Sequence, residues 1–272
     1  MDHDQEGVLT ALRKYGVHGE LVNWDDPAIN WSKYDLAVVR STWDYVQRHT
    51  EFLRWVDQVD RDTRLCNPRS VLQRYTDKAY LKDLAAAGIA TVPTVWIGPG
   101  ETLAAEAAPW PELVIKPSVS CAGQDTLRTR DRSAAVAHIA GLTEIGRTAL
   151  VQPCLPMVQE EGEVSLVFLG GKFSHAVRRY PRLVGQAADF HEDPCIGMVL
   201  PQPTADHLDL AQEALSVLPE RDELLYARVD LVRDETGHPM LLELELVEPF
   251  LYLGFGPGAT DRFAAALVAA VG

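Results

Sequence analysis

Charged residues at every second position mark two segments near the C-terminal end of the chain. These segments are YARVDLV (226–232) and LLELELVEP (241–249), and apolar residues separate their charges. A period of two is that of a β-strand with one buried face. The connector DETGHP is rich in turn-forming residues, so the segments are predicted to form an antiparallel hairpin, with Arg233 opposite Met240.

In this register the hairpin gathers three carboxylates and an arginine. Asp230 lies opposite Glu243, and the strand period puts Arg228 and Glu245 on the same face. Like charges opposite each other destabilise a sheet, so the patch requires a cation, and Glu243→Gln is expected to stabilise the metal-free protein. Oxygen ligands without a nearby His or Cys suit Mg²⁺, which binds through one or two carboxylates plus substrate phosphates. An ordinary half-exposed hairpin has the same pattern and is the alternative.

A loop of small residues in the middle of the chain has the composition of an anion site. The segment ELVIKPSVSCAGQDTLRTR (112–130) indicates a strand ending at Lys116, a loop from Ser118 to Gly123, and a returning strand. Small residues let backbone N–H groups approach an anion closely, and the lysine supplies a positive charge. A plain hairpin with a flexible loop is the alternative.

The elements that must position these residues follow the pattern of an α+β protein. Helices are predicted at 6–16, 51–59, 70–88, 131–140, 206–218 and 260–271, and further strands at 19–24, 34–39, 64–68, 89–97, 148–156, 162–169 and 172–181. The N-terminal part reads as α/β, but it opens on a helix where such a unit normally opens on a strand. We therefore expect either a strand encoded upstream of Met1 or an open sheet edge covered by a partner, as in a homodimer.

Composition sets the class of protein. The 272 residues are 47% apolar and 24% charged, as in soluble globular proteins, and they contain no run of about 18 apolar residues that would cross a membrane. The N-terminus lacks the apolar core of a signal peptide, so a cytoplasmic protein is expected. A net charge of −14 argues against nucleic-acid binding. The four cysteines are widely spaced and are expected to be reduced thiols: Cys66, Cys121, Cys154 and Cys195.

Five phrases in a fixed order resemble a known family. They are DKAYL (77–81), VIKPSVSCAG (114–123), VQPCLP (151–156), GEVSLVF (162–168), and the pair RVDLV and LELELVEP (228–249). Together they resemble the glutathione-synthetase-like branch of the ATP-grasp superfamily. The phrases RSTWDY, NP and PT add a resemblance to the O-ureido-serine cyclo-ligases of cycloserine biosynthesis.

The resemblance implies a fold and an activity. An N-terminal α/β substrate part (1–75) would precede a lid part (76–150) and a C-terminal part (151–272), the last two being antiparallel-sheet α+β units that sandwich ATP. The implied activity is that of an ATP- and Mg²⁺-dependent ligase for a small amino-acid-like substrate. It would activate a carboxylate-type carbonyl as an acyl phosphate, which an amine then attacks, with ring closure where both groups belong to one molecule.

The resemblance also assigns roles to residues. Arg228 and Lys116 would stabilise charge on the transferred phosphoryl group, and Asp230, Glu243 and Glu245 would hold Mg²⁺. The nucleotide would contact Lys78, Lys116, Ser118, Ser120, Gly123, Gln152, Cys154, Leu155, Glu160 and Glu163. The metal motif departs from the superfamily at one position, because Glu245 stands where Asn is usual.

The lid and C-terminal parts would bind ATP and metal, so the residues that select the acceptor substrate must lie elsewhere in the chain. The segment RSTWDY (40–45) is the best candidate. It follows a predicted strand at its carboxyl end, where open α/β sheets bind ligands. Arg40 can clamp a carboxylate, Ser41 and Thr42 can form hydrogen bonds, and Trp43 and Tyr45 can wall a pocket. The alternative is that the aromatic residues only pack against the next helix.

Arg178 is a further candidate acceptor contact. If RSTWDY instead serves the nucleotide, the acceptor site is expected at Arg178, Arg179 and the ADFHEDP loop (188–194), which carries His191. Two further classes of protein stay open at this point. One is a catalytically silent ATP-binding regulatory module, and the other is an α+β binding domain that takes no nucleotide. A shift of the melting temperature by MgATP separates the first from the second, and ADP release separates an enzyme from both.

Overall fold

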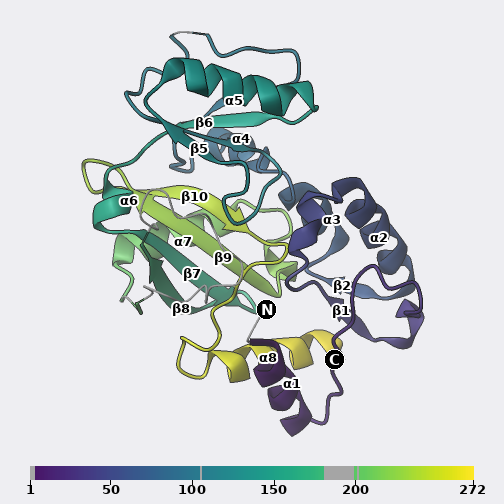
Figure 1. Cartoon of the computed structure of the whole chain (residues 1–272). Coiled ribbons are helices and arrows are strands. Elements are labelled where there is room, and N and C mark those ends of the chain that lie inside the picture. The colour runs from purple at the N-terminus through teal and green to yellow at the C-terminus, as the bar shows by residue number, and fades with distance from the viewer. Residues whose placement is uncertain (1–3, 105, 181–198, 201) are drawn as a thin grey trace.

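The structure is a computed structural model that describes residues 4–104, 106–180, 199–200 and 202–272. It contains two four-stranded antiparallel sheets, stacked one above the other, and a small parallel pair of strands beside them (Figure 1). This is the predicted α+β class. Within the described residues no helix has the length and apolar character needed to cross a membrane.

The N-terminal part forms an α/β layer around two parallel strands. Its elements are α1 (Asp4–Lys14), η1 (Trp31–Lys33), β1 (Leu36–Val38), η2 (Trp43–Val46), α2 (His49–Asp62), β2 (Arg64–Cys66) and α3 (Arg69–Tyr75). Phe52, Val56 and Val59 lie on one face of α2 and are fully buried, so an amphipathic helix covers the strand pair. The predicted strand at 19–24 is wrong, because residues 17–23 have neither helical nor strand structure and no described strand pairs with them.

The smaller sheet, in the order β3-β6-β4-β5, lies above the central sheet. It consists of β3 (Val95–Ile97), β4 (Leu113–Pro117), β5 (Leu127–Thr129) and β6 (Ala149–Pro153). Helix α5 (Arg132–Glu144) covers its outer face, where Ile115, Ile139 and Val151 pack together. Strand alternation therefore turns Lys116 and Gln152 toward the central sheet.

The central sheet, in the order β10-β9-β7-β8, carries the acidic hairpin. Its strands are β7 (Glu163–Leu169), β8 (Lys172–Arg179), β9 (Tyr226–Arg233) and β10 (Pro239–Glu245), and α6 (Met157–Glu160) leads into it. Its rear face packs on α7 (Ala205–Ser216) through residues such as Leu231 and Leu244. Helix α8 (Ala259–Val271) packs against α1, so the two ends of the described chain meet beneath this sheet (Figure 1).

The hairpin has the predicted facing residues but a shifted turn. Asp230 pairs with Glu243, as predicted, whereas Arg233 pairs with Pro239 and not with Met240. An irregularity between Leu241 and Glu243 absorbs the one-residue difference. As a result Leu241 is fully buried, while Leu242, which was expected in the core, is only partly buried.

The predicted single helix at 70–88 is wrong, because it is broken in the middle. It forms α3 and α4 (Tyr80–Ala86), and the carboxylate of Asp77 accepts a hydrogen bond from the N–H of Ala79 at 2.9 Å in the break. The N–H of Lys78 donates to the carbonyl of Ser118 at 2.9 Å instead of to a helical carbonyl. The break thus fixes Lys78 against the small-residue loop.

Asn67 joins the N-terminal part to the central sheet. Its side chain is fully buried and donates to the carbonyls of Tyr226 and Leu246 at 3.0 and 2.7 Å, while its oxygen accepts from the N–H of Leu225 at 2.8 Å. We expect Asn67→Ala to lower the free energy of unfolding by about 2–4 kcal/mol, because three buried backbone groups lose their partner. Urea denaturation measures the change. The exposed Asn23→Ala is the control, and equal stability of the two variants would contradict this assignment.

Candidate active site

The front face of the central sheet holds a network of buried charges around Asp230. Arg228 donates to both oxygens of Asp230 at 2.9 and 2.8 Å, Ser165 donates to one at 2.7 Å, and Arg179 donates to the other at 3.0 Å. Burial alone would raise the pKa of Asp230, but Arg228 and Arg179 outweigh burial and hold that pKa below its usual range. Asp230 is therefore an ionised anchor for two arginines.

Two lysines from the upper part of the molecule reach the same face. The ammonium of Lys78 lies 2.9 Å from Glu243 and donates to the carbonyl of Ser120 at 2.6 Å. Burial would lower the pKa of Lys78, but the ion pair with Glu243 outweighs burial and raises it. Lys116 has no ion pair among the described residues. Burial, aided by the charge of Lys78 and opposed by that of Glu243, lowers the pKa of Lys116. Because no described carboxylate pairs with it, the side chain of Lys116 is available to an anionic ligand.

Glu245 titrates near neutrality. Burial raises its pKa to about 7, and the charges of Glu243 and Asp230 add to this shift against the effect of Arg228, which donates to one of its oxygens. Because its pKa is higher in the folded than in the unfolded chain, the folded state binds more protons at pH values between these two pKa values. Stability should therefore fall as the pH rises through this window.

This pH effect gives a test of Glu245. Between about pH 5 and about pH 8 the metal-free protein should lose about 1–3 kcal/mol of its free energy of unfolding through this group, and Glu245→Gln should remove that part of the loss. Urea denaturation of both proteins in the presence of a chelator measures it. Parallel pH dependence in the two proteins would show that Glu245 does not titrate in this range.

The carboxylates fit Mg²⁺ as a pair and not as a group of three. Glu243 and Glu245 each use one oxygen in an ion pair, and the other oxygen of each has no partner among the described residues. Both oxygens of Asp230 are taken by Arg228, Arg179 and Ser165. Consistently, no group of three or more metal-binding side chains is assembled in the described part of the chain. Two carboxylates with free oxygens suit Mg²⁺ that is also bound by phosphate.

The small-residue loop lies directly over this face. Ser118 and Ser120 are buried, and the hydroxyl of Ser120 donates to the carbonyl of Pro117 at 3.0 Å. Gly123 has a φ of +73°, a conformation that favours glycine. Arg147 donates to the carbonyl of Val119 at 2.8 Å and so fixes the base of the loop. These hydrogen bonds and the left-handed conformation of Gly123 thus fix both ends of the loop.

The expected adenine residues lie where the two sheets are connected. Gln152 is buried and donates to the hydroxyl of Thr94 at 2.8 Å, and the N–H of Cys154 donates to the carbonyl of Glu112 at 3.0 Å. Leu155 follows in the same connection. The described cysteines Cys66, Cys121 and Cys154 are free thiols, as expected, and Cys195 lies outside the described residues.

The two glutamates expected at the ribose differ in setting. Glu160 is exposed on α6, whereas Glu163 begins β7 and accepts a hydrogen bond from Arg179 at 2.9 Å. The structure thus joins Glu163 to the charged network and leaves Glu160 outside it.

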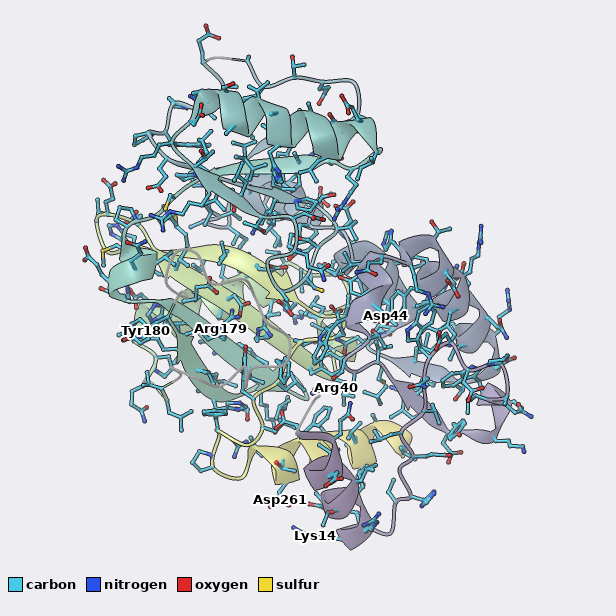
Figure 2. All side chains as sticks on the ribbon, viewed as in Figure 1. Lys14, Arg40, Asp44, Arg179, Tyr180 and Asp261 are labelled. Atoms are coloured by element: carbon cyan, nitrogen blue, oxygen red, sulfur yellow. The ribbon has the colours of Figure 1, made fainter. Side chains whose placement is uncertain are left out.

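The RSTWDY segment divides between two hollows. Arg40, Ser41 and Thr42 line a cleft of about 1070 Å³ that also touches α1 and α8, and the guanidinium of Arg40 lies 5.6 Å from the ring centre of Phe263 in α8. Figure 2 shows Arg40 between the central sheet and α8, with Arg179 on the sheet itself. The hydroxyl of Thr42 is buried without a hydrogen-bond partner in the described structure. Polar groups of this segment therefore face a space large enough for a small molecule.

The aromatic half of the segment lies closer to the charged network. The ring of Trp43 stacks on Phe250 with centroids 4.9 Å apart, and its indole N–H donates to the carbonyl of Glu248 at 3.3 Å. Tyr45 lines a small cavity of about 20 Å³ together with Lys78 and Glu243. Of the two hollows, the small cavity is the one bordered by Lys78, Glu243 and Glu245, the residues that the sequence assigned to phosphate and metal.

Arg178 lies away from this centre. It pairs with Val164 on the rear face of the central sheet, on the side of His207 and α7. An irregularity in β8 places Arg179 opposite Glu163 instead. His175 is buried and its Nε2 lies 2.9 Å from the carbonyl of Leu251, a structural position, whereas the ADFHEDP loop with His191 lies outside the described residues.

Sequence reasoning did not single out Ser165 or Glu248, and it named Arg179 only beside Arg178 as an alternative acceptor contact. The β-bulge in β8 separates the two arginines, and the sequence pattern did not indicate this bulge. Ser165 could have been found from the hairpin alternation, because it shares a face with Glu163. The signal for Glu248 was present in the phrase LELELVEP, where it is the third glutamate.

Comparison with known proteins identifies the family. The N-terminal residues 1–67 match the family model described as the N-terminal domain of D-cycloserine synthetase DcsG. Over 98% of its length the chain is 35% identical to the cycloserine biosynthesis protein DcsG of Streptomyces lavendulae, of which it covers 93%. The chain belongs to the DcsG family of ATP-grasp ligases.

Solved structures agree with membership of the DcsG family. The crystal structure of D-cycloserine synthetase DcsG superposes with a TM-score of 0.89 at 32% identity, covering all of this chain and 95% of that one. The ATP complex of D-alanine–D-alanine ligase from Bacillus anthracis has a TM-score of 0.65 at 16% identity, with 98% and 90% covered, and so shares the fold. As in the sequence prediction, this chain is an ATP-grasp ligase.

Proposed function

We propose that this DcsG-family protein activates a carboxylate-type carbonyl of a small amino-acid-like molecule with ATP and Mg²⁺, and closes a cycloserine-like ring. The supporting observation is that Lys78, Glu243 and Glu245 border one small cavity. Arg228 is ion-paired to Glu245, and the charge of Glu243 acts on Lys116, so both cations belong to the same charged network. Phosphoryl transfer needs positioned charges more than a side-chain nucleophile, and this is what the cavity offers. We further propose that 1–75 serves the substrate, 76–150 the lid and 151–272 the nucleotide and metal.

The reaction divides into two steps. A carboxylate oxygen of the substrate attacks the γ-phosphorus of ATP, and ADP leaves, which gives an acyl phosphate. A nitrogen of the same molecule then attacks the acyl carbon, inorganic phosphate leaves, and the nitrogen gives up its proton. The C–N bond closes a ring.

The chain's own residues supply charge and orientation. Lys116 lies free of ion pairs in the described structure and faces the central sheet, so it can bind the transferred phosphoryl group. Arg228 is held rigid by Asp230 and stabilises charge that develops during transfer. Glu243 and Glu245 would hold Mg²⁺, which when bound neutralises phosphate charge.

The nucleotide and the acceptor would occupy neighbouring places. We assign the phosphates to Lys78, Ser118, Ser120 and the loop ending at Gly123, and the base to the connection at 152–155. The acceptor contacts are assigned to Arg40, Ser41, Thr42 and Trp43, because their segment runs from the large cleft to the small cavity. Solved relatives in the fold family carry ATP or AMPPNP, which supports the nucleotide assignment.

Nucleotide binding tests the phosphate lysine. MgATP is expected to raise the melting temperature of the wild-type protein, because a ligand that binds only the native state stabilises it. Lys116→Ala should remove most of this shift, since Lys116 makes no ion pair in the described structure whose loss would disturb the fold. Differential scanning fluorimetry measures both proteins, with the exposed Lys172→Ala as a control. An undiminished shift in Lys116→Ala would refute the assignment.

Turnover tests the reaction. The wild-type protein with ATP, Mg²⁺ and O-ureido-serine should release ADP and phosphate and close the ring, measured by a coupled ADP assay and by mass spectrometry. Ring closure leaves the carbamoyl group on the ring nitrogen, and cycloserine forms when water removes that group as carbon dioxide and ammonia. Binding of MgATP without ADP release on any amino-acid, ureido or hydroxyamino derivative would instead identify a regulatory module.

A further inference from the structure

Glu248 is a buried carboxylate that the reaction outlined above does not use. It follows β10 in the chain, its exposed fraction is 7%, and it lines the small cavity with Tyr45, Cys121 and Glu245. The indole N–H of the neighbouring Trp43 donates to the backbone carbonyl of Glu248 and not to the Glu248 carboxylate. The cavity is therefore bordered by a carboxylate that stands between the acceptor segment and the phosphoryl-transfer residues.

Within the described residues the carboxylate of Glu248 has no hydrogen bond and no ion pair. The nearby cations are committed elsewhere, since Lys78 pairs with Glu243 while Arg228 pairs with Asp230 and Glu245. Burial, together with the charge of Glu245, raises the pKa of Glu248 well above its usual range. A buried carboxylate is costly to keep charged unless a cation lies beside it. The described residues place no cation against this carboxylate, so a cationic ligand bound here would favour its ionised form and pair with it.

We propose that Glu248 binds the positively charged amino group of the ligase substrate. This inference rests on the proposed function and adds the residue that would select substrates with a free α-ammonium group. The position supports it, because an amino acid whose carboxylate is activated beside Lys116 and Arg228 carries its ammonium only two bonds away from that carboxylate.

The cavity must open for this ligand. Its volume of about 20 Å³ corresponds to about one water molecule. The loop residue Cys121 closes it through a weak contact, in which its thiol donates to the carbonyl of Trp43 at 3.5 Å. This contact between Cys121 and Trp43 is of a kind that a substrate can replace.

The test compares O-ureido-serine with its analogue in which a hydroxyl replaces the α-amino group. The wild-type enzyme should favour the amino substrate in kcat/KM by at least about tenfold, because the analogue leaves Glu248 unpaired. Glu248→Gln should raise the KM for the amino substrate by at least about tenfold, abolish the preference, and leave the KM for ATP within about twofold. Glu248→Asp, which keeps the charge, should retain the preference. The exposed Glu235→Gln of the same hairpin is the matched control.

The outcomes separate this inference from the proposed function. A wild-type enzyme that turns over neither compound contradicts the proposed function itself. A wild-type enzyme that turns over the amino substrate, together with a Glu248→Gln variant that keeps both its KM and its preference, overturns the inference alone. The melting temperature of each variant is measured in parallel, so that a loss of fold is not read as a loss of binding.

Discussion

Glu243→Gln is expected to lower kcat by at least about 100-fold, because it removes one of two carboxylates that fit Mg²⁺ and the charge that holds Lys78 in place. It should also lower the free energy of unfolding by about 1–3 kcal/mol, since Lys78 is 5% exposed and loses its ion-pair partner. Steady-state ADP release at saturating ATP and Mg²⁺ measures the first effect, and urea denaturation the second.

The stability result decides between two views of the hairpin. The sequence pattern predicts that the substitution stabilises the metal-free protein by relieving repulsion, whereas in the structure the carboxylate is already paired with a buried lysine. Glu235→Gln, at the exposed turn of the same hairpin, should change neither kcat nor stability. A Glu243→Gln variant with full Mg²⁺-dependent activity would mean that the acidic face is only a solvated surface.

Arg228→Lys is expected to lower kcat by about 100- to 1000-fold even though it keeps the positive charge. Lysine cannot reproduce the two parallel hydrogen bonds to Asp230, nor the further bonds to Glu245 and to the carbonyl of Phe250. The charge would therefore no longer be held where it develops in the transition state. Single-turnover ADP formation measures the chemical step directly.

A matched control for this substitution lies on the same strand. Arg233 is on the rear face of the sheet and pairs with Asp206 at 2.8 Å, so Arg233→Lys should leave kcat nearly unchanged. If Arg228→Lys retains activity within about threefold of the wild type, the guanidinium geometry is not part of catalysis.

Patterns local in sequence predicted much of the arrangement that the structure shows around Asp230. The alternation in 226–245 sufficed to place Asp230 opposite Glu243, because the register at the site is set by the buried leucines and valines of the rear face. The strand predicted to end at Lys116 ends one residue later, at Pro117, and the run of small residues from Ser118 onward indicated the loop that follows. The alternation of polar and apolar residues could not reveal the β-bulge. An extra residue in one strand leaves the alternation intact on each side of the bulge, but it changes which residue of the neighbouring strand lies opposite.

Two bulges account for the main differences between prediction and structure. One moves the turn of the acidic hairpin by one residue, and the other brings Arg179, and not Arg178, to the front face of the central sheet. Contacts between residues far apart in the chain could not be predicted from the sequence pattern either. The hydrogen bond between Lys78 and the carbonyl of Ser120 joins residues far apart in the chain, and it depends on a helix break that the helical periodicity of 70–88 did not indicate.

Transfer of oxygen from the substrate to phosphate tests the central claim most directly. The protein is incubated with ATP, Mg²⁺ and O-ureido-serine in which both carboxylate oxygens are oxygen-18, and the inorganic phosphate is analysed by mass spectrometry. Activation as an acyl phosphate predicts one labelled oxygen in each phosphate released together with cycloserine, because the bond between carbon and the bridging oxygen breaks in the second step. Product formation with unlabelled phosphate would contradict carboxylate activation by this site.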